Sequence, residues 1–267
     1  MTAADAISDD QIDAKWSEIS PLIERVMQRV GTADEFPIAA GSSISGDDQA
    51  SRPYHVSHSV RSCLLAGVDH LHAVKSLIVD QGVLHTLAPF TLARGSLENL
   101  SLAYWILHPA SRDERIQRAL RWHAQNFIDQ DKALAPLSLP NHVDKETKLQ
   151  KVEATASARG INTNIRRGHS STEAVTYADS NATTARNVLF AWRLCSGYAH
   201  GRQWALLGGS DREEHPTVDP DVVNIKLTAS TRNTLFVTLE SLHLLSDVLR
   251  TYDQRAGAHL SNLVVQV

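Results

Sequence analysis

The chain has 267 residues, of which 42 % are hydrophobic and 21 % charged, and its net charge is −4 at pH 7. This composition is typical of a globular protein that is long enough to bury a sizeable core. No stretch approaches the roughly 20 apolar residues that span a bilayer, and the acidic start "MTAADAISDDQIDAKW" lacks the basic and apolar regions of a signal peptide. We therefore expect a cytoplasmic protein with no membrane partner.

The charges and cysteines give two further expectations. The first 50 residues hold ten Asp or Glu and three Lys or Arg, a balance of −7, so the remaining residues carry +3. This weakly basic body permits an anionic partner but lacks the dense basic face of a strong nucleic-acid binder. Cys63 and Cys195 each lie in a predicted helix with no second cysteine nearby, which indicates buried thiols in a reducing compartment.

Helical periodicity predicts a first helix up to residue 30. Asp9 and Asp10 can cap it. Ser20-Pro21 is compatible with two short helices or with one kinked helix. Residues 31–52 contain turn-forming residues and no period, so we predict a linker or mobile loop there. The apolar residues of the first helix recur every three or four positions: Ile12, Trp16, Ile19, Ile23, Val26 and Val30.

Three long helices are predicted next. Residues 54–81 show the cleanest helical period in the chain, from Val56 to Ile78. A second helix, roughly 88–107, begins near Pro89 and ends at the dipeptide "HP". Ser111 caps a third helix, "SRDERIQRALRWHAQNFIDQDKAL", whose first turn is acidic as the helix dipole favours.

The rest of the chain is predicted to contain a polar helix at 144–158, a long loop at 160–180 and an apolar helix at about 181–200. "WALLGG" and "VVNIKLTAS" are predicted to form a small hairpin, and Ser230 or Thr231 caps a last helix through about 254. The predicted fold class is all-α, an antiparallel helical bundle with a small β-hairpin before the last helix. The predicted parts are an N-terminal helical arm (1–30), a linker (31–52), a helical bundle domain (53–256) and a tail (257–267).

An arginine and a histidine in the apolar run "NATTARNVLFAWRLCSGYAHG" are the best candidates for a functional site. Seven residues advance an α-helix by nearly two turns, so Arg193 and His200 lie on one face, about 10 Å apart along the axis. Because the surrounding residues are apolar, we expect this helix to be buried and the guanidinium to be paired. The partner is either a carboxylate, of which Glu98 with Arg94 one turn before it is the best candidate, or an external anion such as a phosphate.

"RLCSGYAH" fits the Arg-x(4–6)-His pattern of the HEPN superfamily, which consists of compact helical bundles. "LARGSLENLSLAYWILHP" and "YAHGRQWAL" also resemble segments of uncharacterised bacterial helical proteins related to that superfamily. The resemblance implies a homodimer in which two protomers form a metal-independent ribonuclease site, active in stress or defence. It implies that Arg193 stabilises phosphate charge and that His200 acts as general acid or base. Glu98, Arg94, Ser196 and Tyr198 are the expected supporting residues.

Two hypotheses follow from these residues. In the first, an Arg193–His200 cleft binds an anionic partner, RNA or a nucleotide, and cleaves RNA. In the second, the protein is a non-catalytic helical binding or scaffold protein in which Arg193 and Glu98 form a structural ion pair. No cofactor is expected under either hypothesis.

Two other patterns are weaker candidates for binding. Arginines recur every three residues on one predicted helix, at 112, 115, 118 and 121, and could follow a phosphate backbone. Neighbouring acidic residues favour a solvated face instead. Arg112 and Arg115 of this helix remain weak anion-binding candidates. Arg166 and Arg167, which lie in the predicted loop at 160–180, are a similar weak candidate pair. The histidines at 55, 58, 70, 72 and 85 have no spacing that brings four ligands together, so no metal site is expected.

Overall fold

The computed structural model describes residues 7–137 and 143–264, and this part of the chain forms ten α-helices and one two-stranded antiparallel sheet. The predicted all-α class, with a small hairpin before the last helix, is confirmed. The helices are α1 (Asp9–Arg29), α2 (Ser43–Ala50), α3 (Val56–Lys75), α4 (Ala88–Leu107), α5 (Arg112–Leu134), α6 (Lys145–Ser157), α7 (Ser171–Asn181), α8 (Val188–Ala199), α9 (Gln203–Gly209) and α10 (Thr231–Ala256). The strands are β1 (Asp211–Pro216) and β2 (Val223–Thr228).

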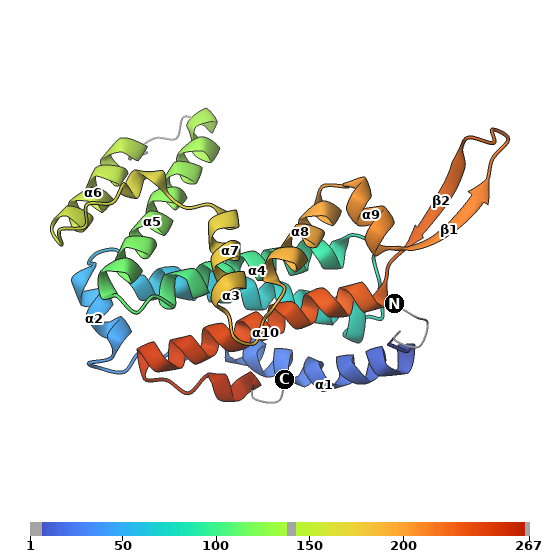
Figure 1. Ribbon diagram of the computed structural model, residues 1–267. Coiled ribbons are helices and arrows are strands. Elements are labelled where there is room, and N and C mark those ends of the chain that lie inside the picture. The colour runs from blue at the N-terminus through green and yellow to red at the C-terminus, as the bar shows by residue number, and fades with distance from the viewer. Residues whose placement is uncertain (1–6, 138–142, 265–267) are drawn as a thin grey trace.

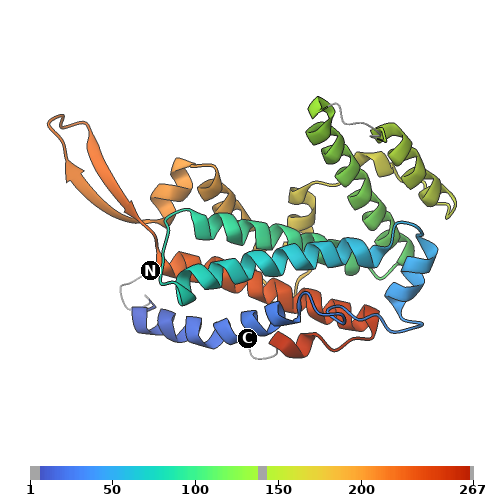
Figure 2. The same cartoon turned by 180° about the vertical axis from the view of Figure 1, so that it is seen from behind.

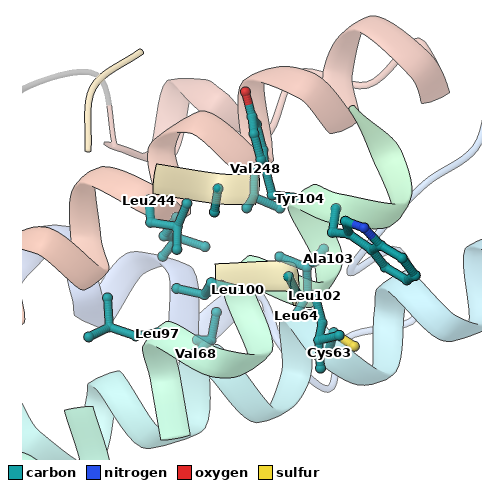
Figure 3. Packing of buried hydrophobic residues seen from close by; sticks show 14 of the residues in the cluster. Cys63, Leu64, Val68, Leu97, Leu100, Leu102, Ala103, Tyr104, Leu244 and Val248 are labelled. Carbon is teal, nitrogen blue, oxygen red and sulfur yellow. The ribbon is translucent and has the colours of Figure 1, made fainter. Parts of the chain in front are cut away.

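Helix α4 is the centre of the bundle. It is apolar around most of its circumference, and it packs against α3, α7, α8 and α10. Figure 3 shows Leu100 surrounded by side chains from α3 and α10, including Val68 and Leu244. A helix that is apolar all round belongs in a core, which is why its predicted limits, 88–107, agree with the structure.

The bundle is elongated, with one appendage at each end. Helices α1, α3, α4 and α10 lie alongside one another, while α5 and α6 rise from one end (Figures 1 and 2). The β1–β2 ribbon projects from the other end, beside α9. The two appendages leave α7 and α8 on the same side of the bundle, between them.

The predicted N-terminal arm is part of the bundle core. Helix α1 is one continuous helix that contains Pro21, which decides between the two alternatives left by the sequence. Ser8, and not Asp9 or Asp10, is the N-cap. Ile19 and Ile23 are fully buried, and the helix packs against α3. Residues 1–6 of the predicted arm lie outside the described residues.

The predicted linker at 31–52 is wrong in its second half, where α2 forms. Ser42 caps this helix, and Ile44 and Asp47 are both 0 % exposed. The sequence "SISGDDQA" has no helical period because only one of its apolar side chains reaches the core. An ion pair from Asp47 to Arg115 of α5 fastens the helix instead, with oxygen–nitrogen distances of 2.7 and 3.0 Å.

The predicted loop at 160–180 contains α7, and α8 begins seven residues later than expected. Ser170 caps α7 by accepting a hydrogen bond from the Glu173 backbone N–H. Between α7 and α8, backbone N–H groups are bound by two carboxylates of α10, at Asp247 and Glu240. In a continuous helix these N–H groups would donate to backbone carbonyls. Here they donate to the two carboxylates instead, and the segment at 182–187 is not helical.

The first strand of the hairpin is formed by other residues than those predicted. "WALLGG" lies in α9, and β1 is the following segment, "DREEHP". The second strand lies within the predicted segment. Ala205 and Trp204 approach the backbone at Gly197, so the short α9 packs tightly on α8 through a position without a side chain. This packing against α8 favours a helix at α9, and the sequence of α9 alone does not indicate it.

The expectation that no stretch is long and apolar enough to span a bilayer does not hold for one helix. Val56–Asp80, which is α3 and the π-helical turn after it, is sufficient to cross a membrane by length and composition alone. In this structure α3 packs between α1 and α4. Lys75 near its end pairs with Glu24 and Asp80, each at 2.9 Å.

The predicted tail folds back onto the bundle as far as it is described. Gly257 adopts the left-handed conformation (φ 67°) that ends α10. Asp253 then accepts hydrogen bonds from the backbone N–H groups of Leu260 and Ser261, both at 2.7 Å. Val264 is buried. Residues 265–267 lie outside the described residues.

Burial of a histidine predicts that acid destabilises this fold. His123 of α5 packs against Tyr54, and its desolvation lowers its pKa from 6.5 to about 4. The unfolded chain therefore binds more protons than the folded chain between those two values, so stability falls as the pH decreases through this window. We expect His123 alone to account for a loss of about 2 kcal/mol in the free energy of unfolding between about pH 7.5 and about pH 5.

Urea unfolding at the two pH values tests this expectation. A His123→Asn variant should lose most of the pH dependence. The fall that remains should be the contribution of His108, His169 and His243, whose pKa values burial also lowers. A pH dependence that is equal in the variant and the wild type would contradict the assignment to His123.

Candidate functional site: the outer face of α8

Three carboxylates fix the start of α8. Asp247 accepts hydrogen bonds from the backbone N–H groups of Thr183, Thr184 and Ala185, at 2.8–3.1 Å. Glu240, two turns earlier on α10, accepts from the backbone N–H groups of residues 186 and 187, both at 3.1 Å. Asp179 of α7 accepts from the Leu189 backbone N–H at 3.0 Å. The position of α8 is therefore set by hydrogen bonds to these carboxylates as well as by apolar packing.

Helix α8 buries one face and exposes the other. Val188, Ala191 and Cys195 are fully buried in the core, and burial raises the pKa of the Cys195 thiol. Arg193 and His200 are exposed. Within the described part of the chain, no carboxylate pairs with either of them. The expectation of a buried guanidinium paired with a carboxylate is therefore wrong, because α8 covers α4 with only one side, while the alternative of an external anion stays a prediction.

Glu98 has other partners than Arg193. It accepts hydrogen bonds from the Ser171 hydroxyl and from the Trp192 indole nitrogen, the latter at 3.2 Å. Arg94 lies 3.4 Å from the same carboxylate and 5.9 Å from the centre of the Trp192 ring. The predicted proximity of Arg94 and Glu98 is present, and the predicted Arg193–Glu98 pair is not. The Glu98 cluster connects α4, α7 and α8 on the side of α8 that Trp192 occupies.

A polar cleft of about 330 Å³ opens next to Glu98. Its lining includes His169, whose pKa is lowered first by burial and then by the nearby Arg121 guanidinium. The lining presents two carboxylates and two amides, a set suited to hydrogen-bonding neutral or cationic groups. Neither Arg193 nor His200 belongs to it. The lining residues are Glu98, Leu102, Trp122, Gln125, Asn126, Asp129, His169, Ser170 and Ser171.

The two other expected supporting residues differ in exposure. Tyr198 is buried and stacks on Phe90, with ring centres 3.8 Å apart and planes 4° apart. Its hydroxyl lies 3.1 Å from that of Ser210, and burial raises its pKa. Tyr198 is therefore a core residue and does not reach the Arg193 side of α8. Ser196 is half-buried, and its carbonyl accepts the His200 backbone N–H at 3.1 Å.

The arginines of α5 are structural. Arg115, which is 2 % exposed, forms a two-point ion pair with Asp47 and donates to two backbone carbonyls. Arg118 bonds to Glu114 and lies over the Trp105 and Tyr177 rings. Arg121 forms a two-point pair with Glu173 at 2.6 and 2.9 Å. These residues follow neither a phosphate backbone nor a solvated face, so both sequence readings of this stripe are wrong.

The remaining anion-binding candidates have separate outcomes. Arg112 is half-exposed but lies 3.1 Å from Asp47, so it extends the same buried pair. Arg166 bonds to Glu146 and Glu153, which raise its pKa. Arg167 is exposed. Arg112 and Arg166 are thus each engaged with a carboxylate, and anion binding at Arg167 stays a prediction.

The histidines do not assemble a metal site in the described residues, where no group of three or more metal-ligating side chains is present. His55 and His58 pack ring against ring, 4.7 Å apart. His70 bonds to the backbone of its own helix, and His72 bonds to Glu24.

The exposed side of α8 has a defined composition. We call the exposed side chains of Arg186, Phe190, Arg193 and His200 the α8 face. Phe190 and Arg193 belong to α8, Arg186 lies just before it, and His200 is its C-cap. Phe190 is 57 % exposed, although its ring also meets that of Phe236. The segment from Arg186 to Trp204 contains three arginines and no Asp or Glu. This face can therefore offer a positive field and one aromatic ring to a ligand.

Comparisons of this chain with family models, with curated proteins and with solved structures find no significant match. The HEPN resemblance therefore stays a prediction.

Proposed function

We propose that the α8 face binds single-stranded RNA. The observation that carries this proposal is a group of exposed side chains along α8: Phe190 and Arg193 lie three residues apart on the helix, and His200 is its C-cap. Arg186, two residues before the helix, is also exposed. Cationic side chains interleaved with an exposed aromatic ring suit a sugar–phosphate backbone whose bases can stack on a π-face. The polar cleft beside Glu98 carries carboxylates and is less suited to phosphate.

A homodimer would turn this binding face into a cleavage site. In one chain Arg193 and His200 are about 10 Å apart along the helix axis, so one copy offers a single imidazole to a phosphodiester. General acid–base cleavage needs a base at the 2′-hydroxyl and an acid at the leaving oxygen. Two copies of the α8 face supply both groups, as the HEPN resemblance implies.

The step needs no metal ion. One His200 imidazole takes the proton of the 2′-hydroxyl, and the 2′ oxygen forms a bond to the adjacent phosphorus. The bond from phosphorus to the 5′ oxygen breaks, and that oxygen takes a proton from the second, protonated His200. The products are a 2′,3′-cyclic phosphate and a 5′-hydroxyl. Arg193 contributes by stabilising the charge on the non-bridging oxygens. We propose that this activity operates in the cytoplasm, in stress or defence.

A second candidate function is non-catalytic binding at the same face. The surroundings of His200 favour this candidate. Glu98 is hydrogen-bonded to Trp192 and Ser171, and within the described residues no carboxylate orients the His200 ring. A histidine whose ring is not oriented is a weaker acid–base catalyst. Under this candidate the protein holds RNA without cleaving it.

Substitutions on the α8 face should affect RNA and not the fold. Arg193→Ala and His200→Ala each remove an exposed side chain, so the free energy of unfolding should change by less than about 0.5 kcal/mol. Binding of a fluorescently labelled single-stranded RNA should weaken about tenfold for Arg193→Ala, and the slope of log Kd against log salt should fall by about 1. If the dimer cleaves RNA, His200→Ala should slow cleavage by about 10²–10⁴-fold.

The matched control is Arg25→Ala, which removes an exposed arginine from α1, away from α8. RNA binding should be unchanged in this variant. Wild-type protein that does not bind the labelled RNA, or Arg193→Ala protein that binds it as well as the wild type, would overturn the proposal. Binding of free nucleotides without binding of RNA would also overturn it.

A further inference from the structure

The β1–β2 ribbon lacks packing on either face. All six residues of β1 are exposed, and in β2 only Leu227 is partly covered. The strand register places Ile225 opposite Glu214 and Leu227 opposite Arg212, so one face of the ribbon carries Val223, Ile225 and Leu227 in a row. An isolated two-stranded hairpin is marginally stable in water. The ribbon therefore needs a surface to pack on.

Exposed apolar side chains are concentrated around this ribbon. Of the thirteen large apolar residues that are exposed in the described part of the chain, ten belong to the ribbon, to α8 and α9, or to the turn between α3 and α4. That turn lies beside α9 at the base of the ribbon in both views (Figures 1 and 2). The ten are Val79, Val83, Leu87, Phe190, Trp204, Leu207, Val218, Val222, Val223 and Ile225. Such a concentration is typical of a protein–protein interface.

The ribbon and the helices before it carry opposite charges. Residues 211–228 hold five Asp or Glu and two Lys or Arg, a balance of −3. The segment from Arg186 to Trp204 has a balance of +3. In one molecule the ribbon projects away from α8 and α9 and does not cover them (Figure 1). A second copy of the chain offers the surface of opposite charge that the ribbon does not reach in its own molecule.

We infer that the ribbon is a dimerisation arm that docks on α9 of a second copy. The face with Val223, Ile225 and Leu227 packs on Trp204 and Leu207 of α9, and the acidic side chains of the ribbon lie beside Arg202. A twofold axis makes the contact reciprocal, because each copy offers both an arm and an α9 surface. The arm does not depend on the proposed RNA function, but it supplies the dimer that a two-histidine site requires.

Removal of the arm tests this inference directly. Asp211 pairs with Thr228 at the base of the ribbon, so a short Gly-Ser turn can replace residues 211–228 without pulling on α9 or α10. Light scattering should give the wild type a mass of twice the 29.3 kDa chain and the shortened protein the mass of one chain. Circular dichroism should show the same helix melting in both, which separates loss of the dimer from loss of the fold.

Two neighbouring substitutions isolate the apolar face. Ile225→Lys and Asn224→Lys add the same charge to β2 on opposite faces of the ribbon. We expect the dimer dissociation constant to rise at least about tenfold for Ile225→Lys. A tenfold change corresponds to the binding free energy of roughly one buried aliphatic side chain. It should change little for Asn224→Lys. Trp204→Ala should weaken the dimer, and Gln203→Ala should not.

The outcomes separate this inference from the RNA proposal. A monomeric wild type, or a dimer that survives removal of the arm, would overturn the inference. A dimer that is sensitive to Ile225→Lys but not to Trp204→Ala would also overturn it, since the ribbons would then pair with each other. An arm-dependent dimer that does not bind RNA would support the inference while the RNA proposal fails.

Discussion

Replacement of Asp47 by asparagine should lower the free energy of unfolding by about 3–5 kcal/mol, the typical cost of leaving a buried charge without its partner. Asp47 is 0 % exposed, and its two oxygens hold the guanidinium of Arg115 at 2.7 and 3.0 Å. An asparagine side chain has the same shape but no charge. The positive charge of Arg115 would stay buried, with only neutral carbonyl and hydroxyl oxygens around it.

Chemical denaturation at neutral pH measures this loss. Asp69→Asn is a matched control, because it makes the same substitution at an exposed position of α3, and it should change stability by less than about 0.5 kcal/mol. A double variant, Asp47→Leu with Arg115→Met, should recover much of the stability, since a buried pair can be exchanged for apolar side chains of similar volume. Equal stability of Asp47→Asn and wild type would mean that α2 is not fastened by this pair.

The elements that the sequence predicted are those that apolar burial determines. Leu97, Leu100 and Tyr104 repeat at helical spacing on a buried face of α4, and the buried residues of this helix run from Pro89 to Leu107, so its limits could be read from the apolar pattern. Helix α2 could not be predicted in this way. Its one fully buried apolar residue gives no period, and the residue that fastens it, Asp47, pairs with an arginine 68 positions away.

The candidate site was predicted only in part for the same reason. The pattern placed Arg193 and His200 on one side of α8, but it could not decide whether that side faces α4 or solvent. Glu98 was correctly associated with Arg94, while its bond to Trp192, 94 positions away, carried no local signal because tryptophan also fits an apolar stripe. Long-range polar contacts decide these questions, and one sequence does not display them.

Replacement of Asp247 by alanine should have the second large effect, and it should be concentrated at α8. This carboxylate accepts hydrogen bonds from three consecutive backbone N–H groups, those of Thr183, Thr184 and Ala185, and from the Thr183 hydroxyl at 2.7 Å. Alanine leaves these donors without an acceptor, and each buried unpaired donor costs about 1–3 kcal/mol. Because Thr183 is exposed and can bond to water, we expect a total loss of about 3 kcal/mol.

Hydrogen exchange distinguishes this local effect from a general loss of stability. In Asp247→Ala, the amides of α8 should exchange faster by a larger factor than those of α3, because the connection that positions α8 is released while the α3–α4 packing is retained. Gln254→Ala, an exposed substitution on the same α10 helix, should leave both sets unchanged. The RNA affinity of Asp247→Ala should also fall, although Asp247 is not part of the α8 face. A mobile α8 no longer holds Arg193 and His200 at fixed positions relative to each other. Amides of α8 that stay as protected as in the wild type would show that apolar packing alone positions this helix.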